Sequence, residues 1–162
     1  MSSAERGVGL HATAVVFGEW GVIILGTSGS GKSALALALL ARARDSGRYG
    51  ALIGDDRVWL RTQHGRLIAR GAGHMAGLIE QRPTGIVKAP FEPAAVIRLA
   101  VELRDSQLLP RLPERPDLWT AQGIAAPRLA LDRGRSAAEN ALAVDARLGS
   151  SASAGRLTMN FA

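Results

Sequence analysis

The sequence contains no cysteine, and aromatic residues make up only 4% of its 162 positions. Without cysteine, the chain can form neither disulfide bonds nor a thiolate metal site. The core must be built mainly from aliphatic side chains, because hydrophobic residues still account for 47% of the chain. The length is that of one domain with a sizeable core.

Long apolar segments are also missing. No run of hydrophobic residues approaches the roughly 20 that are needed to span a bilayer. No apolar signal segment follows residues 1–6. We therefore expect a cytoplasmic protein that does not contact the membrane.

Acidic residues are outnumbered by basic ones, with 14 Asp and Glu against 20 Lys and Arg, a formal charge of +6. Only Lys32 and Lys88 are lysines. Arginine presents a planar fork that suits phosphates, carboxylates and acidic protein surfaces. The arginines are scattered, and no aromatic residues alternate with them as a platform for stacking bases. We therefore expect a partner with an acidic surface and do not expect a nucleic acid.

The most informative stretch is a glycine-rich loop, Gly26-Thr27-Ser28-Gly29-Ser30-Gly31-Lys32-Ser33. It fits G-x-x-x-x-G-K-[ST], the phosphate-binding P-loop. The apolar run 21–25 before it predicts a buried strand, and the Ala- and Leu-rich segment 33–44 after it predicts a helix. Glycines let backbone N–H groups turn toward a phosphate, and the helix N-terminus adds the positive end of its dipole. The loop predicts a nucleotide site, with Lys32 on the β- and γ-phosphates and Ser33 on Mg²⁺.

Strand patterns outnumber helix patterns in the rest of the chain. Further strands are predicted at 11–17, 51–54, 58–60, 67–69, 94–103 and 127–131, and a second helix at 136–148. That helix begins with a capping box, in which Ser136 is the N-cap and Glu139 follows three residues later. Several strands follow one another as hairpins, unlike a regular alternation of strand and helix. We expect a single α/β domain over 1–148, with a mixed sheet that contains the P-loop and has flanking helices, and a disordered tail over 149–162.

Two adjacent carboxylates, Asp55 and Asp56, follow the apolar strand at 51–54. Open α/β sheets bind ligands at the carboxyl ends of their strands. There, one carboxylate can hold Mg²⁺ and another can accept a proton from an incoming nucleophile. A simple turn is the alternative interpretation, since Asp is common after strands. The P-loop upstream favours a functional pair.

Other polar residues are ambiguous from spacing alone. His11 begins the strand before the P-loop strand, where a histidine is either a surface residue or part of a site. Glu80 and Arg82 fit a metal ligand and a phosphate clamp, but an exposed ion pair has the same pattern. Arg133 and Arg135 fit either a phosphate-contacting loop or a solvated turn before the last helix.

Taken in order, these motifs resemble the catalytic domain of HPr kinase/phosphorylase, a bacterial family that phosphorylates and dephosphorylates a serine of the phosphocarrier protein HPr. The matching features are a histidine opening a strand, the loop ending Gly-Lys-Ser, a strand ending Asp-Asp, and a basic Gly-Arg loop before a helix. Residues 78–86, Leu-Ile-Glu-Gln-Arg-Pro-Thr-Gly-Ile, are similar to the family signature Leu-Glu-Ile-Arg-Gly-Leu-Gly-Ile. The resemblance extends from His11 to about 148 and implies the HPr kinase/PEP carboxykinase-like fold.

The resemblance also implies roles for the matching residues. Asp56 would accept the proton in phosphorylation, and His11 would be an active-site residue. Ser33 and Glu80 would ligate Mg²⁺, with Asp55 orienting the metal shell.

Two basic segments complete the implied site. Arg111, in Pro-Arg-Leu-Pro, matches a catalytic arginine of the family. The segment Arg133-Gly134-Arg135 corresponds to the loop used for phosphorolysis, and Arg82 lies within the signature.

The resemblance predicts ATP and Mg²⁺ as cofactors, an HPr-like phosphocarrier as partner, and the hexamer of full-length members as a candidate assembly. Because the motifs begin at His11, it points to the short form without a separate N-terminal domain. Pro83 replaces a glycine of the signature, which leaves an ATP-sensing regulator without transferase activity as an alternative. A small-metabolite P-loop kinase is a further alternative, although no clear lid helix is present.

Overall fold

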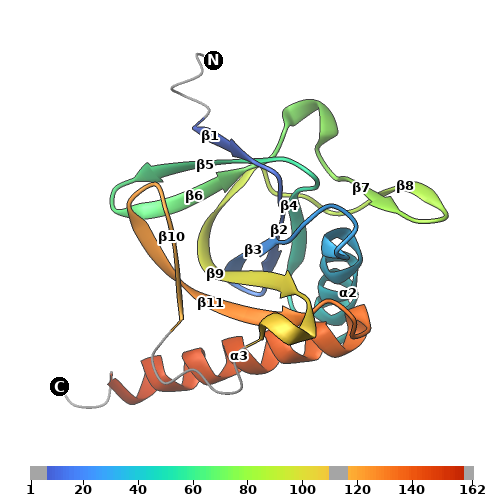
Figure 1. Cartoon of the computed structure of the whole chain (residues 1–162). Coiled ribbons are helices and arrows are strands. Elements are labelled where there is room, and N and C mark those ends of the chain that lie inside the picture. The colour runs from blue at the N-terminus through green and yellow to red at the C-terminus, as the bar shows by residue number, and fades with distance from the viewer. Residues whose placement is uncertain (1–6, 110–116, 159–162) are drawn as a thin grey trace.

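The computed structural model describes residues 7–109 and 117–158, with side chains described as far as Ser151. The strands are β1 (Val8–Leu10), β2 (Thr13–Phe17), β3 (Trp20–Leu25), β4 (Gly50–Gly54), β5 (Val58–Gln63), β6 (Arg66–Arg70), β7 (Leu78–Gln81), β8 (Gly85–Lys88), β9 (Ala94–Arg104), β10 (Leu118–Ala121) and β11 (Ile124–Asp132). The helices are α2 (Lys32–Asp45) and α3 (Ala137–Thr158), with 3₁₀ turns η1 (Gly73–Met75) and η2 (Ser106–Leu108). Figure 1 shows a curled sheet with α2 and α3 packed on one side of it.

The strand β9, 11 residues long, connects the two halves of this sheet. On one edge it pairs antiparallel with β6 and then in parallel with β11. On the opposite edge it pairs in parallel with β3, the strand that leads into the glycine loop. The strand order is β1-β5-β6-β9-β3-β2-β4, with β11 beside β9 and β10 beside β11. These parallel and antiparallel pairs, together with the flanking helices, confirm the predicted fold class.

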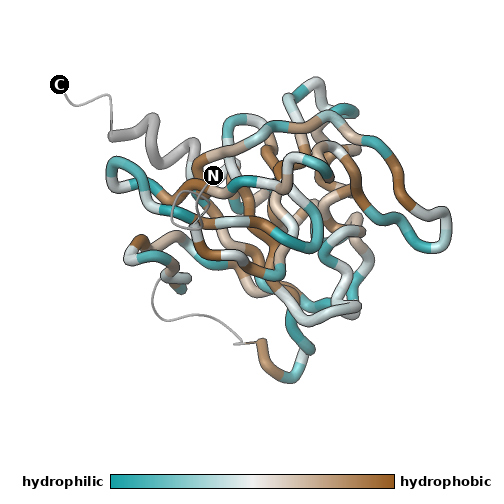
Figure 2. Tube along the Cα trace, turned by 90° about the horizontal axis from the view of Figure 1, so that it is seen from above, coloured by the Kyte–Doolittle hydropathy of each residue, from teal (hydrophilic) through white to brown (hydrophobic). Residues whose placement is uncertain are grey.

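Apolar side chains cover both faces of the central strands. In β3, Val22 and Ile24 belong to the core beneath the two helices, whereas Ile23 belongs to the core inside the curl of the sheet. This alternation follows from the two-residue period of a strand. Helix α2 adds Leu35 and Leu39, which are 1% and 0% exposed. Burying a side chain of this size contributes about 1.5–3 kcal/mol. Figure 2 shows hydrophobic residues along the central strands and hydrophilic ones in many of the turns.

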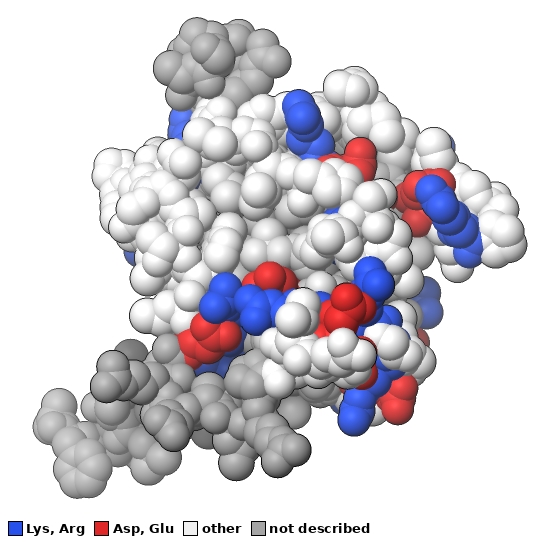
Figure 3. Space-filling model, viewed as in Figure 1, with Lys and Arg blue, Asp and Glu red and all other residues white. Residues whose placement is uncertain are grey.

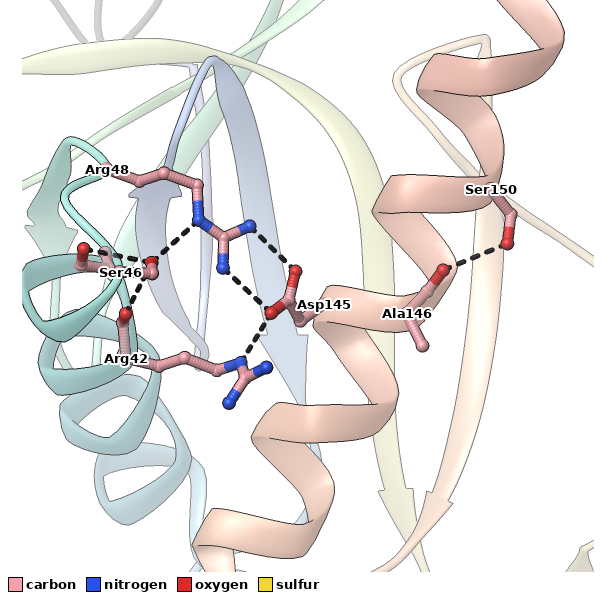
Figure 4. A network of polar contacts seen from close by, with 7 residues as sticks. Arg42, Ser46, Arg48, Asp145, Ala146 and Ser150 are labelled. Atoms are coloured by element: carbon pink, nitrogen blue, oxygen red, sulfur yellow. Dashed lines mark hydrogen bonds and ion pairs between the residues drawn. The ribbon is translucent and has the colours of Figure 1, made fainter.

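A polar network joins the two helices at their surface. Asp145 of α3 accepts hydrogen bonds from Arg42 Nε at 2.5 Å and from both terminal nitrogens of Arg48 at 2.7 and 2.8 Å (Figure 4). The Arg48 hydrogen bond and charge, aided by Arg42, lower the pKa of Asp145 from 3.8 to about 2. The guanidinium of Arg48 also lies 4.4 Å from the ring centroid of Phe17 in β2. The network therefore ties both helices to the sheet.

Several strands lie where no strand was predicted. Residues 8–10, which precede the first predicted strand, form β1 and pair with β5. The signature segment forms the hairpin β7–β8, a separate two-stranded sheet that projects from the body in Figure 1. β10 pairs with β11. The signal was weak in each case because these strands are short, and β1 also depends on a partner far along the chain.

The last helix is longer than predicted. Its start agrees with the capping box, since the Glu139 N–H donates to Ser136 Oγ at 3.2 Å and Ser136 N–H donates to Glu139 Oε2 at 3.0 Å. However, α3 continues to Thr158, so the tail expected to be disordered is helical over 149–158, and 159–162 lie outside the described residues. Ser150 donates to the carbonyl of Ala146 at 3.0 Å, so this small polar side chain is satisfied within the helix. In the described parts of the chain, no helix has the length and apolar character required to cross a membrane.

Candidate active site

The glycine loop joins the end of β3 to the start of α2, as the motif requires. Gly31 is the N-cap of α2 with a φ of 97°, and Gly29 has a φ of 77°, a region that side chains with a Cβ rarely occupy. A Cβ on Gly26 would lie 2.4 Å from the Oγ atom of Ser30. The loop therefore depends on glycine both for its turn and for its close packing. Its backbone leads directly to the N-terminus of α2, which favours an anion.

Lys32, the first residue of α2, is buried beside this loop at 7% exposure. Its Nζ atom donates to the carbonyls of Gly26 and Thr27 at 2.9 and 3.0 Å. Burial lowers the pKa of Lys32, while the charges of Asp56 and Asp55 oppose that shift. The ammonium group is thus held at the loop by weak acceptors, which phosphate oxygens can replace at little cost.

Asp55, which follows β4, connects three parts of the site. Its Oδ1 accepts hydrogen bonds from Ser33 Oγ and from Thr13 Oγ1, each at 2.8 Å. Its Oδ2 accepts the backbone N–H of Glu80 at 3.1 Å. One carboxylate therefore links the glycine loop, the start of β2 and the β7–β8 hairpin.

Asp56 points to a different partner. Its backbone has a φ of 64°, in the left-handed region that Asp tolerates better than most residues. Its Oδ1 lies 3.0 Å from Nδ1 of His11, and the two side chains are 80% and 50% exposed. The pair is open to solvent and therefore accessible to a macromolecular substrate.

A cavity of about 520 Å³ brings these groups together. Its size is within the range of small-ligand sites. It is lined by His11, Ser28, Gly29, Gly31, Lys32, Ser33, Ala34, Leu37, Asp56, Glu80, Gln81 and Arg82. The cavity is therefore lined by most of the predicted loop residues, by His11 and Asp56, and by three residues of the signature segment.

The β7–β8 hairpin forms one side of this cavity. Glu80 and Arg82 both line it, and Arg82 Nε lies 3.2 Å from Glu80 Oε1. Their side chains are 56% and 86% exposed, so this ion pair contributes little to stability. Both side chains are consequently available to a ligand.

The predicted basic loop at 133–135 does not line the cavity. Arg133 lies 2.6 Å from Asp105, and its backbone N–H donates to the carbonyl of Arg104. Arg135 is exposed just before α3, and Arg111 lies outside the described residues. On the face shown in Figure 3, basic and acidic side chains lie next to one another over β9 and β11. Ion pairs there join Arg104 to Glu102 and Arg128 to Glu102 and Asp117.

Sequence reasoning overlooked Thr13 as a site residue. A threonine within an apolar strand gives no functional signal, because strands favour threonine. Its place two residues after His11 was the one available clue. Only the pairing of β2 with β4 reveals its contact with Asp55.

The chemistry of the donors fits Mg²⁺ shared with a nucleotide. Within the described residues, no group of three or more His, Asp or Glu side chains is arranged to hold a metal alone. Mg²⁺ is usually bound by one or two carboxylates together with substrate phosphates and water. The hydroxyl of Ser33 and the carboxylates of Asp55 and Glu80 meet that description beside the glycine loop.

We compared the chain with protein families, with curated sequences and with solved structures. The family model described as the HPr Serine kinase C-terminal domain matches residues 4–139. A solved structure from Coxiella burnetii, described as the Hpr(Ser) kinase/phosphatase, has a TM-score of 0.75 at 24% sequence identity. The alignment covers 94% of this chain and 98% of that chain, and it establishes the common fold. No curated protein sequence matched the chain. Since the family model spans most of its length, the chain belongs to the HPr serine kinase C-terminal domain family and is a kinase of the phosphotransferase class.

Proposed function

We propose that this protein transfers the γ-phosphoryl group of Mg²⁺–ATP to a serine of an HPr-like phosphocarrier protein. One observation carries the proposal: a single cavity is lined by a phosphate-binding loop and by an accessible carboxylate, Asp56, beside His11. A phosphate donor and a proton acceptor are the two parts that phosphorylation of a hydroxyl requires. Family membership supports the same reaction.

The donor would bind along the glycine loop. The backbone N–H groups from Gly26 to Ser33 and the N-terminus of α2 would hold the β- and γ-phosphates. Lys32 would exchange its bonds to the carbonyls of Gly26 and Thr27 for bonds to phosphate oxygens. Leu37 and Ala34 provide the apolar part of the lining.

Ser33 and Glu80 would hold the Mg²⁺ ion together with the phosphates, and Asp55 would orient this set. When bound, the ion neutralises charge that develops on the phosphate oxygens. Asp55 already contacts Ser33 and the backbone of Glu80, which supports this assignment.

The acceptor serine would approach Asp56 from solvent. Its hydroxyl proton passes to Asp56 while its oxygen bonds to the γ-phosphorus, and the bond to the β–γ bridging oxygen breaks to release ADP. His11 would keep the Asp56 carboxylate aligned through the contact at 3.0 Å. In the reverse direction Asp56 would return the proton.

Four arginines and the assembly complete the proposal. Arg82 would clamp a phosphate from the hairpin, and Arg111 would act at the reacting phosphate. Arg133 and Arg135 would form the loop for phosphorolysis, and a hexamer would follow full-length relatives. We place the reaction in the cytoplasm, where ATP is available, and expect the net positive charge to speed encounter with an acidic carrier surface.

The test is transfer of label from [γ-³²P]ATP to a purified HPr protein, with the modified residue located by mass spectrometry. Phosphate on a carrier serine supports the proposal. A matched carrier with that serine replaced by alanine should remain unlabelled. Tight ATP binding without transfer to any carrier would instead indicate an ATP-sensing regulator.

A further inference from the structure

Thr13, the first residue of β2, has a polar contact that the strand does not need for its own structure. The rest of the strand, Ala14 to Phe17, is apolar, and every one of its residues is buried. Thr13 itself is 0% exposed. Burying a hydroxyl is unfavourable unless it finds a hydrogen-bond partner. Here the partner is the Asp55 carboxylate, with Thr13 Oγ1 2.8 Å from Asp55 Oδ1.

The sheet places Thr13 between the nucleotide loop and the aspartate pair. On one side, Thr13 lies opposite Ile24, next to the end of β3 where the loop begins. On the other side, Ala14 lies opposite Gly54, and the register shifts between Ala14 and Val15. That irregularity in the pairing lies at the end of β4, next to Asp55. This placement brings the hydroxyl within hydrogen-bonding distance of Asp55.

The hydrogen bonds at Asp55 decide how the hydroxyl of Ser33 can be used. A carboxylate only accepts, so both Ser33 and Thr13 direct their protons to Asp55 Oδ1. With its proton directed there, the Ser33 oxygen keeps its lone pairs for a cation. Thr13 and the N–H of Glu80 hold the two oxygens of the carboxylate in place.

We propose that Thr13 is a positioning residue for the metal that accompanies the nucleotide: it fixes Asp55, and Asp55 in turn aligns Ser33. This inference rests on the proposed function, because it requires Mg²⁺ to bind with ATP at the loop. Two residues that are two positions apart then contact the two consecutive aspartates: His11 contacts Asp56, and Thr13 contacts Asp55. Thr13 touches neither substrate nor metal.

The test compares Thr13→Val, which keeps the shape and removes the donor, with Thr13→Ser, which keeps the donor. Binding of a fluorescent ATP analogue is titrated with and without Mg²⁺, and thermal unfolding is followed in parallel. For Thr13→Val we expect unchanged metal-free affinity and about a tenfold higher half-saturating Mg²⁺ concentration, as the loss of one hydrogen bond to a charged group implies. Thr13→Ser should restore the wild-type requirement for Mg²⁺.

The matched control is Thr62→Val, because the Thr62 hydroxyl donates to the carbonyl of Gln122 at 2.7 Å on an exposed surface. It should leave the Mg²⁺ requirement unchanged. The inference is overturned if folded Thr13→Val needs no more Mg²⁺ than wild type. It is also overturned if metal-free and Mg²⁺-dependent affinities fall equally with the melting temperature, since that pattern indicates a purely structural role. If wild-type protein binds the nucleotide without any effect of Mg²⁺, the proposed function itself fails.

Discussion

The Nδ1 atom of His11 lies 3.0 Å from an Oδ1 oxygen of Asp56, at the mouth of the cavity that the glycine loop lines. The two residues come from separate segments, one before β2 and one after β4. Their contact explains how a histidine with no distinctive spacing belongs to the site. It also suggests which substitutions separate chemistry from nucleotide binding.

Replacing Asp56 by Asn should abolish transfer to the carrier and preserve nucleotide affinity. Loss of a general base typically costs about 10²–10⁴-fold in rate. Asn also tolerates the positive φ of this position, so folding should be unaffected. Labelled transfer and nucleotide titration measure the two effects, with the exposed Asp45→Asn as control. Transfer at the wild-type rate would exclude Asp56 as the base.

As the pH is raised, the affinity for ATP should begin to fall at a lower pH than it would if Lys32 had the pKa of an ordinary lysine. Only the protonated form of Lys32 binds phosphate well, and burial lowers the pKa of this lysine from its usual 10.5. As the pH rises through that lowered pKa, affinity should drop by up to about tenfold per pH unit. Calorimetric titrations across the alkaline range test this. AMP, which lacks the β- and γ-phosphates, should show a much weaker pH dependence; an equal dependence would contradict the role of Lys32.

Gly71→Ala should destabilise the fold and reduce transfer, whereas Gly73→Ala should be neutral. A Cβ on Gly71 would lie 2.0 Å from the carbonyl oxygen of Ile53, so the end of β4 and the following aspartates would have to move. Overpacking of this kind costs about 1–3 kcal/mol. A Cβ on Gly73 would meet nothing within 4 Å. Urea unfolding and transfer assays of both variants provide the comparison, and equal stabilities would show that β4 does not need this close approach.

Asp145→Asn should lower the free energy of unfolding at neutral pH by about 1–2 kcal/mol, after allowance for the partial exposure of its arginine partners. The folded pKa of Asp145, about 2, is below its usual 3.8. Its stabilising contribution is therefore complete above pH 3.8 and is lost as the pH falls toward 2. The difference between wild type and variant, from denaturant unfolding, should shrink over that interval. A difference independent of pH would show that the carboxylate charge is not what joins α2 to α3.

Much of the site followed from local sequence. The P-loop, the strand before it and the helix after it were recognisable because one contiguous segment supplies the glycines, the lysine and the helix start. The capping box at Ser136 and Glu139 was readable for the same reason. Glu80 and Arg82 were ambiguous from residue type alone and gained their roles through the resemblance of their segment; the structure brings both to the cavity. Arg133 was also found in this way, but it pairs with Asp105 outside that cavity.

The sequence by itself determined the local elements and the phosphate-binding loop, because these depend on neighbouring residues and on their periodicity. Only the tertiary structure decided which distant segments meet. The register of β2 against β4 brings Thr13 to Asp55, and the turn after β4 brings Asp56 to His11. The same holds for the pairing of β1 with β5. Such contacts depend on strand order and on the burial of both partners, and neither is encoded in any single stretch of the chain.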